Sequence, residues 1–466
     1  MSQSVSVNDA AIGVSVATIV LLTALIVALV VAAEKQRREP PLPYIPLQDD
    51  GLAGSGVVAV AGGPGSGSGM ATRLKVIPLT WSASGSLYTV GFTVGTDVVE
   101  AAFDTGSARF VVATSDCTGC GKSKYNPAAS KDAIVLIDPR KADKQRTVVE
   151  PLRPDQVGDH AAILCSDTVS YVSQSNNILM YRDTVMFPRR NVSGNSICDG
   201  TSIDGVLDGS IDAPPLTVTD FPVGGITTTT GTTALNVFGM SGVLSVTKTD
   251  DGKYLLPSCQ VSAAESYEAA TVQAIALYYT ARKQPVVWSQ YIGVNAGFML
   301  FGSLALPCNR VQTVKMIRQL TRSTNDVDRT PWRFYVVQVH SMSIDGVALP
   351  RASVPKYLIV DTGTTQTLLP GPSSTSVVAQ IGRATTSVSI TFGSGIDGDS
   401  ATLTYVLGEL TYQSVFGAQP TFAAMPDAVA KLFSADMDVG LFGVTCMRNA
   451  YIEYDLTNRR IGFSKM

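Results

Sequence analysis

The sequence predicts an all-β protein of two lobes with few short helices, preceded by one transmembrane helix. Three observations support this fold class. The chain has 41 glycines and 24 prolines among 466 residues, and only 16% of its residues are charged. This composition is typical of a β protein with many turns, and the length is sufficient for two hydrophobic cores. The other two observations are a pair of similar apolar stretches and an uncharged run near the N-terminus.

The uncharged run predicts a membrane anchor. It covers residues 10–33, after an N-terminal tail at 1–9. A helix of this length, rising about 1.5 Å per residue, spans a bilayer core of roughly 30 Å. No Lys or Arg precedes it, unlike a usual signal peptide, so we expect an uncleaved anchor; cleavage would give a secreted protein. Lys35, Arg37 and Arg38 follow the run, and positive residues favour the cytoplasmic side.

The rest of the chain divides into a linker and two lobes. Residues 34–78 contain P-P-L-P-Y-I-P and G-G-P-G-S-G-S-G. Proline-rich segments are stiff and glycine-rich segments flexible, so we expect a linker that holds a folded domain away from the membrane. We place the N-terminal lobe at 79–305 and the C-terminal lobe at 306–466.

The two apolar stretches predict a shared acidic site. They read A-A-F-D-T-G-S at 101–107 and L-I-V-D-T-G-T-T at 358–365. One Asp-Thr-Gly is ordinary turn chemistry, but two copies, each after a strand-like run, indicate a duplicated lobe. Each lobe would deliver one aspartate, Asp104 or Asp361, to the site. The glycines allow close approach of the backbone. We expect support for the carboxylates from Thr105, Gly106, Ser107, Thr362, Gly363, Thr364 and Thr365.

The sequence gives little support for a zinc hydrolase or a Ser-His-Asp enzyme. The two histidines, His160 and His340, lie in no cluster of His, Cys, Asp and Glu, and no G-x-S-x-G motif lies beside them. We interpret both as structural or solvated. The net charge of −3 gives no indication of nucleic-acid binding.

The order of motifs resembles the pepsin-like aspartic proteases from about residue 85 to 466. A strand, a Gly-Thr turn and a second strand precede Asp104, and C-T-G-C-G-K-S-K-Y-N-P-A-A-S follows at 117–130. The tail at 439–464 matches the family in order, with Leu441-Phe442-Gly443 supporting the second loop. The resemblance implies the bilobal pepsin-like acid protease fold and a catalytic pair of aspartates. It implies neither a cofactor nor a metal.

Further segments of the first lobe resemble family elements. Residues 171–185 begin with Tyr and end in Asp-Thr-Val, as the substrate-binding flap does, which implies that Tyr171 and Ser173 contact substrate. I-D-G-V-L-D-G-S at 203–210 resembles the segment that packs against the first catalytic loop, and this would bring Asp208 close to the dyad. Residues 262–280 show a helical pattern, and 297–303 resemble a strand of the central sheet.

The resemblance implies an aspartic endopeptidase that acts at acidic pH on a peptide or protein substrate, as a monomer. The dyad would share a proton and activate a water molecule. The alternative is a catalytically silent relative that binds a protein or a glycan. Its basis is Asp208, Val111 where the family often has Trp, and Val172 and Gln174 where the flap usually has glycines.

The cysteines bear on the compartment. There are seven, an odd number, so at least one is unpaired or intermolecular. Cys117 and Cys120 predict a short disulfide in an oxidising compartment; a redox or zinc motif is the alternative. Cys446 lies in an apolar run and is expected to be a buried thiol. Together with the N-x-S sequon at Asn191, this predicts a glycoprotein whose catalytic domain is lumenal or extracellular, against the charge rule.

Overall fold

A computed structural model describes residues 73–465 with gaps, of which the longest are 139–151, 194–202, 269–284, 303–310, 318–333 and 431–437. The described part is mostly strand. Its α-helices are short: α3 (Val157–His160), α5 (Ile203–Asp208) and α8 (Asp427–Ala430). Four 3-10 turns are described as well: η1 (Pro127–Ala129), η2 (Pro154–Gln156), η4 (Arg351–Ser353) and η7 (Val444–Met447). The prediction of a mostly β protein with few short helices is confirmed.

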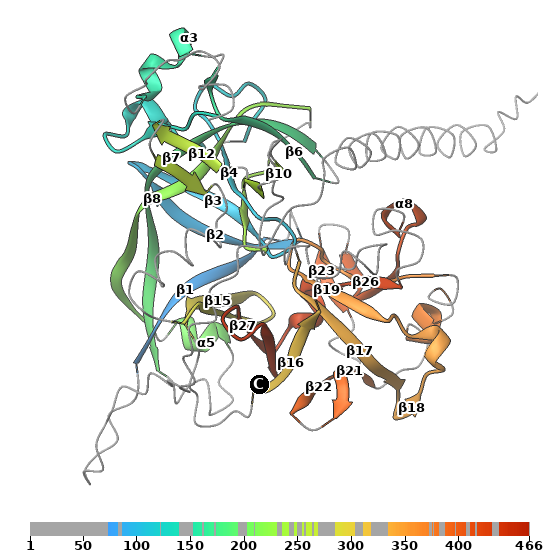
Figure 1. The fold of residues 1–466 in the computed structure, drawn as a ribbon. Helices are drawn as coiled ribbons and strands as arrows, with labels where there is room; N and C mark the ends of the chain where they lie inside the picture. The colour runs from blue at the N-terminus through green and yellow to red at the C-terminus, as the bar shows by residue number, and fades with distance from the viewer. Residues whose placement is uncertain are drawn as a thin grey trace, which may run out of the picture.

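The described part of the first lobe has nine main strands, coloured blue to green in Figure 1. Strand β2 alternates half-buried and buried residues along its whole length, which is the pattern of a strand with one face on a core. The nine strands are β1 (Arg73–Ser82), β2 (Leu87–Val94), β3 (Asp97–Asp104), β4 (Phe110–Ala113), β5 (Ile134–Val135), β6 (Ser166–Tyr171), β7 (Gln174–Ser193), β8 (Ile211–Thr229) and β9 (Val237–Gly239).

The second lobe repeats this plan on the other side of the molecule, in orange to red. In strand β22 every second residue is buried, whereas all of β26 is buried because strands pair with it on both sides. The strands are β17 (Val336–Ile344), β18 (Val347–Ala348), β19 (Tyr357–Asp361), β20 (Thr367–Leu369), β21 (Ser387–Ile396), β22 (Asp399–Val406), β23 (Thr411–Ser414), β24 (Gly417–Pro420), β25 (Phe422–Ala424) and β26 (Val439–Gly443).

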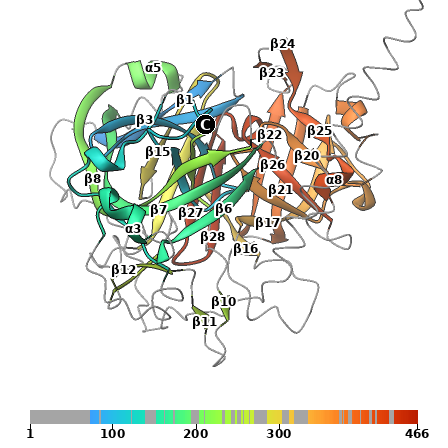
Figure 2. The same cartoon turned by 90° about the horizontal axis from the view of Figure 1, so that it is seen from above.

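A central sheet joins the lobes. Its strands pair in the order β1–β15–β14–β27–β28–β16, all antiparallel. The strands not yet defined are β14 (Val287–Ile292), β15 (Ala296–Phe301), β16 (Gln312–Ile317), β27 (Ala450–Asp455) and β28 (Arg460–Lys465). Figures 1 and 2 both show this sheet between the two lobes. The predicted roles of 297–303 and of the C-terminal tail as central-sheet strands are therefore confirmed.

The core is continuous across the lobe boundary. The largest cluster of buried apolar side chains runs from Phe92 in the first lobe through Trp288 in the central sheet to Phe442 in the second. Close packing of this kind transmits displacements, because interiors have few voids to absorb them. The strands β3 and β19, which end in the two predicted aspartates, are thus held relative to one another by this packing.

Two predictions about segment boundaries were wrong. Residues 73–78, placed in the linker, belong to β1, where Val76 and Ile77 are buried in the sheet. The start of the expected helix at 262–280 forms a hairpin instead, between β12 (Ser258–Ser262) and β13 (Glu265–Glu268). The alternating sequence Ser-Cys-Gln-Val-Ser has the period of a strand. A second small hairpin pairs β10 (Thr247–Lys248) with β11 (Tyr254–Leu255).

The rest of 262–280, like the N-terminal tail, the span at 10–33 and the linker up to residue 72, lies outside the described residues. Among the helices that the structure does describe, none is long and apolar enough to cross a bilayer.

Candidate active site

The two predicted aspartates lie at the ends of equivalent strands. Asp104 is the last residue of β3, and Asp361 is the last residue of β19. Each carboxylate accepts a hydrogen bond from the backbone two residues on: the N–H of Gly106 donates to Asp104 Oδ1 at 2.7 Å, and that of Gly363 donates to Asp361 Oδ1 at 2.9 Å. Each loop therefore holds its own carboxylate in a tight turn.

The threonines that follow the aspartates lock the loops together. Thr105 Oγ1 donates to the carbonyl of Val360, and Thr362 Oγ1 donates to the carbonyl of Phe103, both at 2.9 Å. In return the backbone N–H of Thr105 donates to Thr362 Oγ1, and that of Thr362 donates to Thr105 Oγ1, again at 2.9 Å. Both side chains are fully buried. This symmetric set of four bonds crosses the lobe boundary directly beneath the dyad.

The loop glycines bring the two carboxylates together. A Cβ built on Gly106 would overlap the carboxylate of Asp361, and a Cβ on Gly363 would overlap that of Asp104. Each aspartate thus lies against the glycine of the opposite loop. Any other residue at these two positions would push the carboxylates apart, so the glycines are required for proximity and not only for turn conformation.

The remaining loop hydroxyls have different partners. Thr364 Oγ1 donates to Asp361 Oδ2 at 2.7 Å. Thr365 Oγ1 instead donates to the carbonyl of Ser86 at 2.7 Å, which ties the second loop to the first lobe. Ser107 lies beside Asp104, where it lowers the pKa of that carboxyl against the larger, opposite effect of burial. The seven predicted supporting residues are all at the site.

The electrostatics favour one proton shared between the aspartates. Burial is the main cause that raises the pKa of both carboxyls. For Asp361, the negative charge of Asp104 raises the pKa further, to about 7. Two adjacent carboxylates in a dry site cannot both ionise cheaply, so the pair titrates as one unit. Such a pair offers one base and one acid at the same pH. Among the described residues no group of three or more His, Cys, Asp or Glu is placed to hold a metal ion.

Each catalytic loop is supported by a parallel strand that ends in glycine. On β26, Phe442 lies opposite Val360 and Gly443 opposite Asp361, as predicted. In the first lobe the equivalent strand is β9, with Phe238 opposite Phe103 and Gly239 opposite Asp104. A Cβ on Gly239 would overlap the backbone of the catalytic loop at Ser107 and Arg109.

The expectation that residues 203–210 support the first loop was therefore wrong. Ile203–Asp208 form α5, which packs against β7 and β15 in a separate apolar cluster. The helix that contains Asp208 is consequently not the support of the first loop. The sequence signal for the true partner was the apolar-Phe-Gly triplet at 237–239, which repeats Leu441-Phe442-Gly443.

Val111, at the usual tryptophan position, fills an apolar cluster instead. It is fully buried in β4, together with Cys117, Ile178 and Met180. Ile178 and Met180 belong to β7, the second strand of the predicted flap hairpin. Val111 thus packs in one cluster with residues of the second strand of the hairpin.

The predicted flap is a hairpin. β6 and β7 pair from Ser166 opposite Leu179 to Tyr171 opposite Gln174. The side chain of Tyr171 and all of Ser173 lie outside the described part, so their contacts with substrate stay predictions. Gln174, in place of a glycine, is buried, and its amide group exchanges hydrogen bonds with the backbone N–H and carbonyl of Leu235 at 2.9 and 3.1 Å.

An ion pair that the sequence did not indicate joins the hairpin of β6 and β7 to the first Asp-Thr-Gly loop. Arg109, five residues after Asp104, contacts the carboxylate of Asp167 on β6. Asp167 is half exposed, so the attraction is screened by water and is worth little by itself. Together with the hydrogen bonds of Gln174, it contributes to holding the hairpin next to the first loop.

The other candidate residues have structural places. Cys117 and Cys120 form a disulfide, as predicted, and Cys165 is disulfide-bonded too. Cys446 is a buried thiol in η7. His340 is exposed on β17, and its ring lies against Gly395. His160 ends α3, and its side chain is outside the described part.

Comparison with known proteins supports the reading of the second lobe. Residues 317–466 match the sequence model of the family described as eukaryotic aspartyl protease. No curated protein matches the chain. The matched range contains Asp361 with its threonines, the supporting strand β26 and the two tail strands of the central sheet. Residues 317–466 thus carry the sequence pattern of the eukaryotic aspartyl proteases.

Proposed function

We propose that the protein is an aspartic endopeptidase in which Asp104 and Asp361 activate a water molecule against a peptide carbonyl. The ionised carboxyl takes a proton from the water, and the protonated one donates to the carbonyl oxygen as the tetrahedral intermediate forms. The dyad then protonates the leaving nitrogen, and as the C–N bond breaks a hydroxyl of the tetrahedral intermediate returns a proton to the dyad, which restores the shared proton. The observation that carries this proposal is the juxtaposition of each carboxylate with the glycine of the opposite loop.

The substrate is an extended peptide that lies across the dyad beneath the hairpin of β6 and β7. An extended chain presents its carbonyl to the dyad with apolar side chains on alternate sides. The reaction belongs at acidic pH, because one dyad carboxyl must keep its proton. A pKa raised by burial allows this well above the ordinary carboxyl range.

A peptide-library digest between pH 3 and 7 tests the proposal. Wild type should cleave, and Asp104→Asn and Asp361→Asn should each lose cleavage, because an amide cannot serve as the base. Asp212→Asn is the matched control, since its carboxylate is almost fully exposed on β8, away from the dyad. Cleavage that persists in both dyad variants refutes the mechanism. A wild type that cleaves no peptide over this pH range and binds a transition-state mimic only feebly would support the silent, ligand-binding alternative.

We also propose that residues 10–33 anchor the protein in a membrane, with the catalytic domain lumenal or extracellular and monomeric. The uncharged run supports the anchor, and the disulfide between Cys117 and Cys120 supports an oxidising compartment. Membranes washed at alkaline pH should retain the full chain and release a variant that lacks residues 10–33. Release of the full chain would contradict the anchor.

A further inference from the structure

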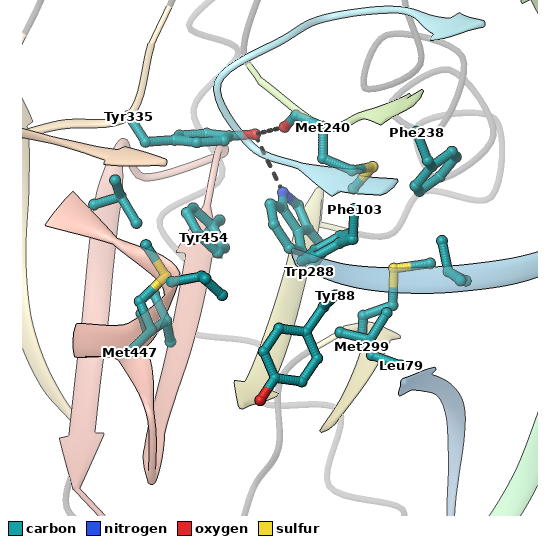
Figure 3. Close-up of a cluster of buried hydrophobic side chains, with 14 of the residues drawn as sticks. Leu79, Tyr88, Phe103, Phe238, Met240, Trp288, Met299, Tyr335, Met447 and Tyr454 are labelled. Atoms are coloured by element: carbon teal, nitrogen blue, oxygen red, sulfur yellow. Dashed lines mark hydrogen bonds between the residues drawn. The ribbon is translucent and has the colours of Figure 1, made fainter. Parts of the chain in front are cut away.

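One buried tyrosine connects the two catalytic loops. Tyr335 lies immediately before β17 in the second lobe and is fully buried. Its hydroxyl crosses to the first lobe and donates to the main-chain carbonyl of Met240 at 2.7 Å (Figure 3). Met240 directly follows β9, the strand that supports the first catalytic loop. This contact is therefore made at the base of the first loop.

The main chain around Met240 holds both ends of the first catalytic loop. The N–H of Met240 donates to the carbonyl of Asp104, and the N–H of Ser241 donates to the carbonyl of Ser107, each at 2.7 Å. The peptide group whose oxygen accepts from Tyr335 is the one whose N–H binds Ser107. A hydrogen-bond donor on that oxygen polarises the peptide group and strengthens the hydrogen bond that its N–H donates to the carbonyl of Ser107. The hydroxyl thus acts on the loop through one peptide group.

The backbone of the same tyrosine holds the second loop. The carbonyl of Tyr335 accepts from the N–H of Val360 at 2.8 Å, and Val360 directly precedes Asp361. Tyr335 is in this way bonded to the supports of both aspartates. Any tilt of one lobe against the other must strain one of these two bonds.

The orientation of the hydroxyl is fixed by its neighbours. The indole Nε1–H of Trp288 donates to Tyr335 Oη at 3.3 Å, which leaves the hydroxyl proton to point at Met240 (Figure 3). Tyr454 stacks on Trp288 with ring centroids 3.9 Å apart and lies 4.5 Å from the ring of Tyr335. These aromatic rings come from the central sheet and the second lobe, and close packing leaves them one arrangement.

We infer that Tyr335 is a positioning residue that sets the alignment of the Asp104 loop relative to the Asp361 loop. This role rests on the proposed endopeptidase function of the same dyad. Without the hydroxyl, the peptide at Met240 loses its buried donor, and the first loop gains freedom to move away from the second. The second loop keeps a support from its own lobe, because Thr445 Oγ1 donates to the carbonyl of Thr365 at 2.6 Å.

The test compares Tyr335→Phe with Tyr88→Phe. Tyr88 is equally buried, and its hydroxyl also donates to a main-chain carbonyl, that of Gly293 at 2.6 Å. Gly293 lies in the turn between β14 and β15, away from the catalytic loops. Both variants should lose similar stability. Only Tyr335→Phe should lower kcat, by about tenfold with KM little changed, because a buried donor to the loop support is lost.

A second readout does not require cleavage. Thermal unfolding between pH 3 and 8 reports the titration of the dyad. In Tyr335→Phe the loosened loops admit water, so the pH at which dyad-linked stability is lost should move toward the ordinary carboxyl range. Equal effects of the two variants on kcat and on this pH would overturn the inference. If wild type cleaves nothing, the proposed function fails, and the titration still decides the role of Tyr335.

Discussion

The four threonine bonds beneath the dyad make a quantitative prediction about stability. Thr362→Val keeps the shape of the side chain and removes the hydroxyl. It leaves two fully buried groups without partners: the N–H of Thr105 and the carbonyl of Phe103, each bonded at 2.9 Å in the wild type. Each orphaned group costs about 1–3 kcal/mol, so the variant should lose about 2–6 kcal/mol. That is a large share of a typical unfolding free energy of about 5–15 kcal/mol.

Denaturant unfolding of purified protein measures this loss. Thr362→Ser is the matched control: it keeps the hydroxyl and loses one methyl group, for about 1 kcal/mol. The m-values of the variants must agree for the free energies to be compared. A Thr362→Val variant no less stable than Thr362→Ser would refute the assignment of the stability to these hydrogen bonds.

The reciprocal variant provides a sharper test. Thr105→Val removes the other two bonds of the set, to the carbonyl of Val360 and from the N–H of Thr362. Because the two pairs of bonds are distinct but cross the same boundary, the double variant should lose less than the sum of the single losses. Strict additivity would show that the two threonines act independently and do not clamp the lobes together.

Three further outcomes follow from the site. Gly363→Ala should lower kcat by about 100-fold, because its methyl group would displace the Asp104 carboxylate; a fall of less than a few-fold would contradict the close approach. Asp208→Ala should leave kcat unchanged, because α5 packs on β7 and β15. A loss of activity would contradict this and would favour the original expectation that residues 203–210 lie beside the dyad. Asp361→Asn should change the pH dependence of stability. The pKa of Asp361 is raised to about 7 in the folded protein. Its carboxyl therefore contributes to the stability of the fold below pH about 4, and this stability is lost as the pH rises toward 7. The melting temperature of Asp361→Asn should therefore exceed that of wild type by a margin that grows over this range, and a constant margin would contradict the raised pKa.

The parts of the site that could be predicted are those encoded in short, contiguous patterns. Asp104 and Asp361 are marked by an apolar strand followed directly by the turn residues that the loop needs. A hairpin was expected from the spacing between Tyr171 and Asp-Thr-Val, which is local, and β6 and β7 do form one around Tyr171. In the tail, the run of mostly buried residues at 450–455 is equally local.

The error at 203–210 has a physical cause. The strand that supports each Asp-Thr-Gly loop pairs with it in parallel from a distant part of the chain. The local sequence does not indicate which apolar segment that ends in glycine will form this pair. At 203–208 the sequence forms a helical turn whose Ile203, Val206 and Leu207 face one cluster. The bonds of Tyr335 and Gln174 escaped prediction for the same reason, since both depend on which backbone carbonyl lies opposite a buried side chain.

The position of β27 and β28 in the central sheet affects the order in which the protein can assemble. They lie between β14 and β16. The sheet that joins the lobes therefore lacks its two middle strands until residues 450–465 have been synthesised. Both Asp-Thr-Gly loops leave the ribosome earlier, yet they cannot be brought into register across an incomplete sheet. The sheet that joins the two lobes, and with it the packing that holds Asp104 beside Asp361, is therefore complete only after residues 450–465 have been added.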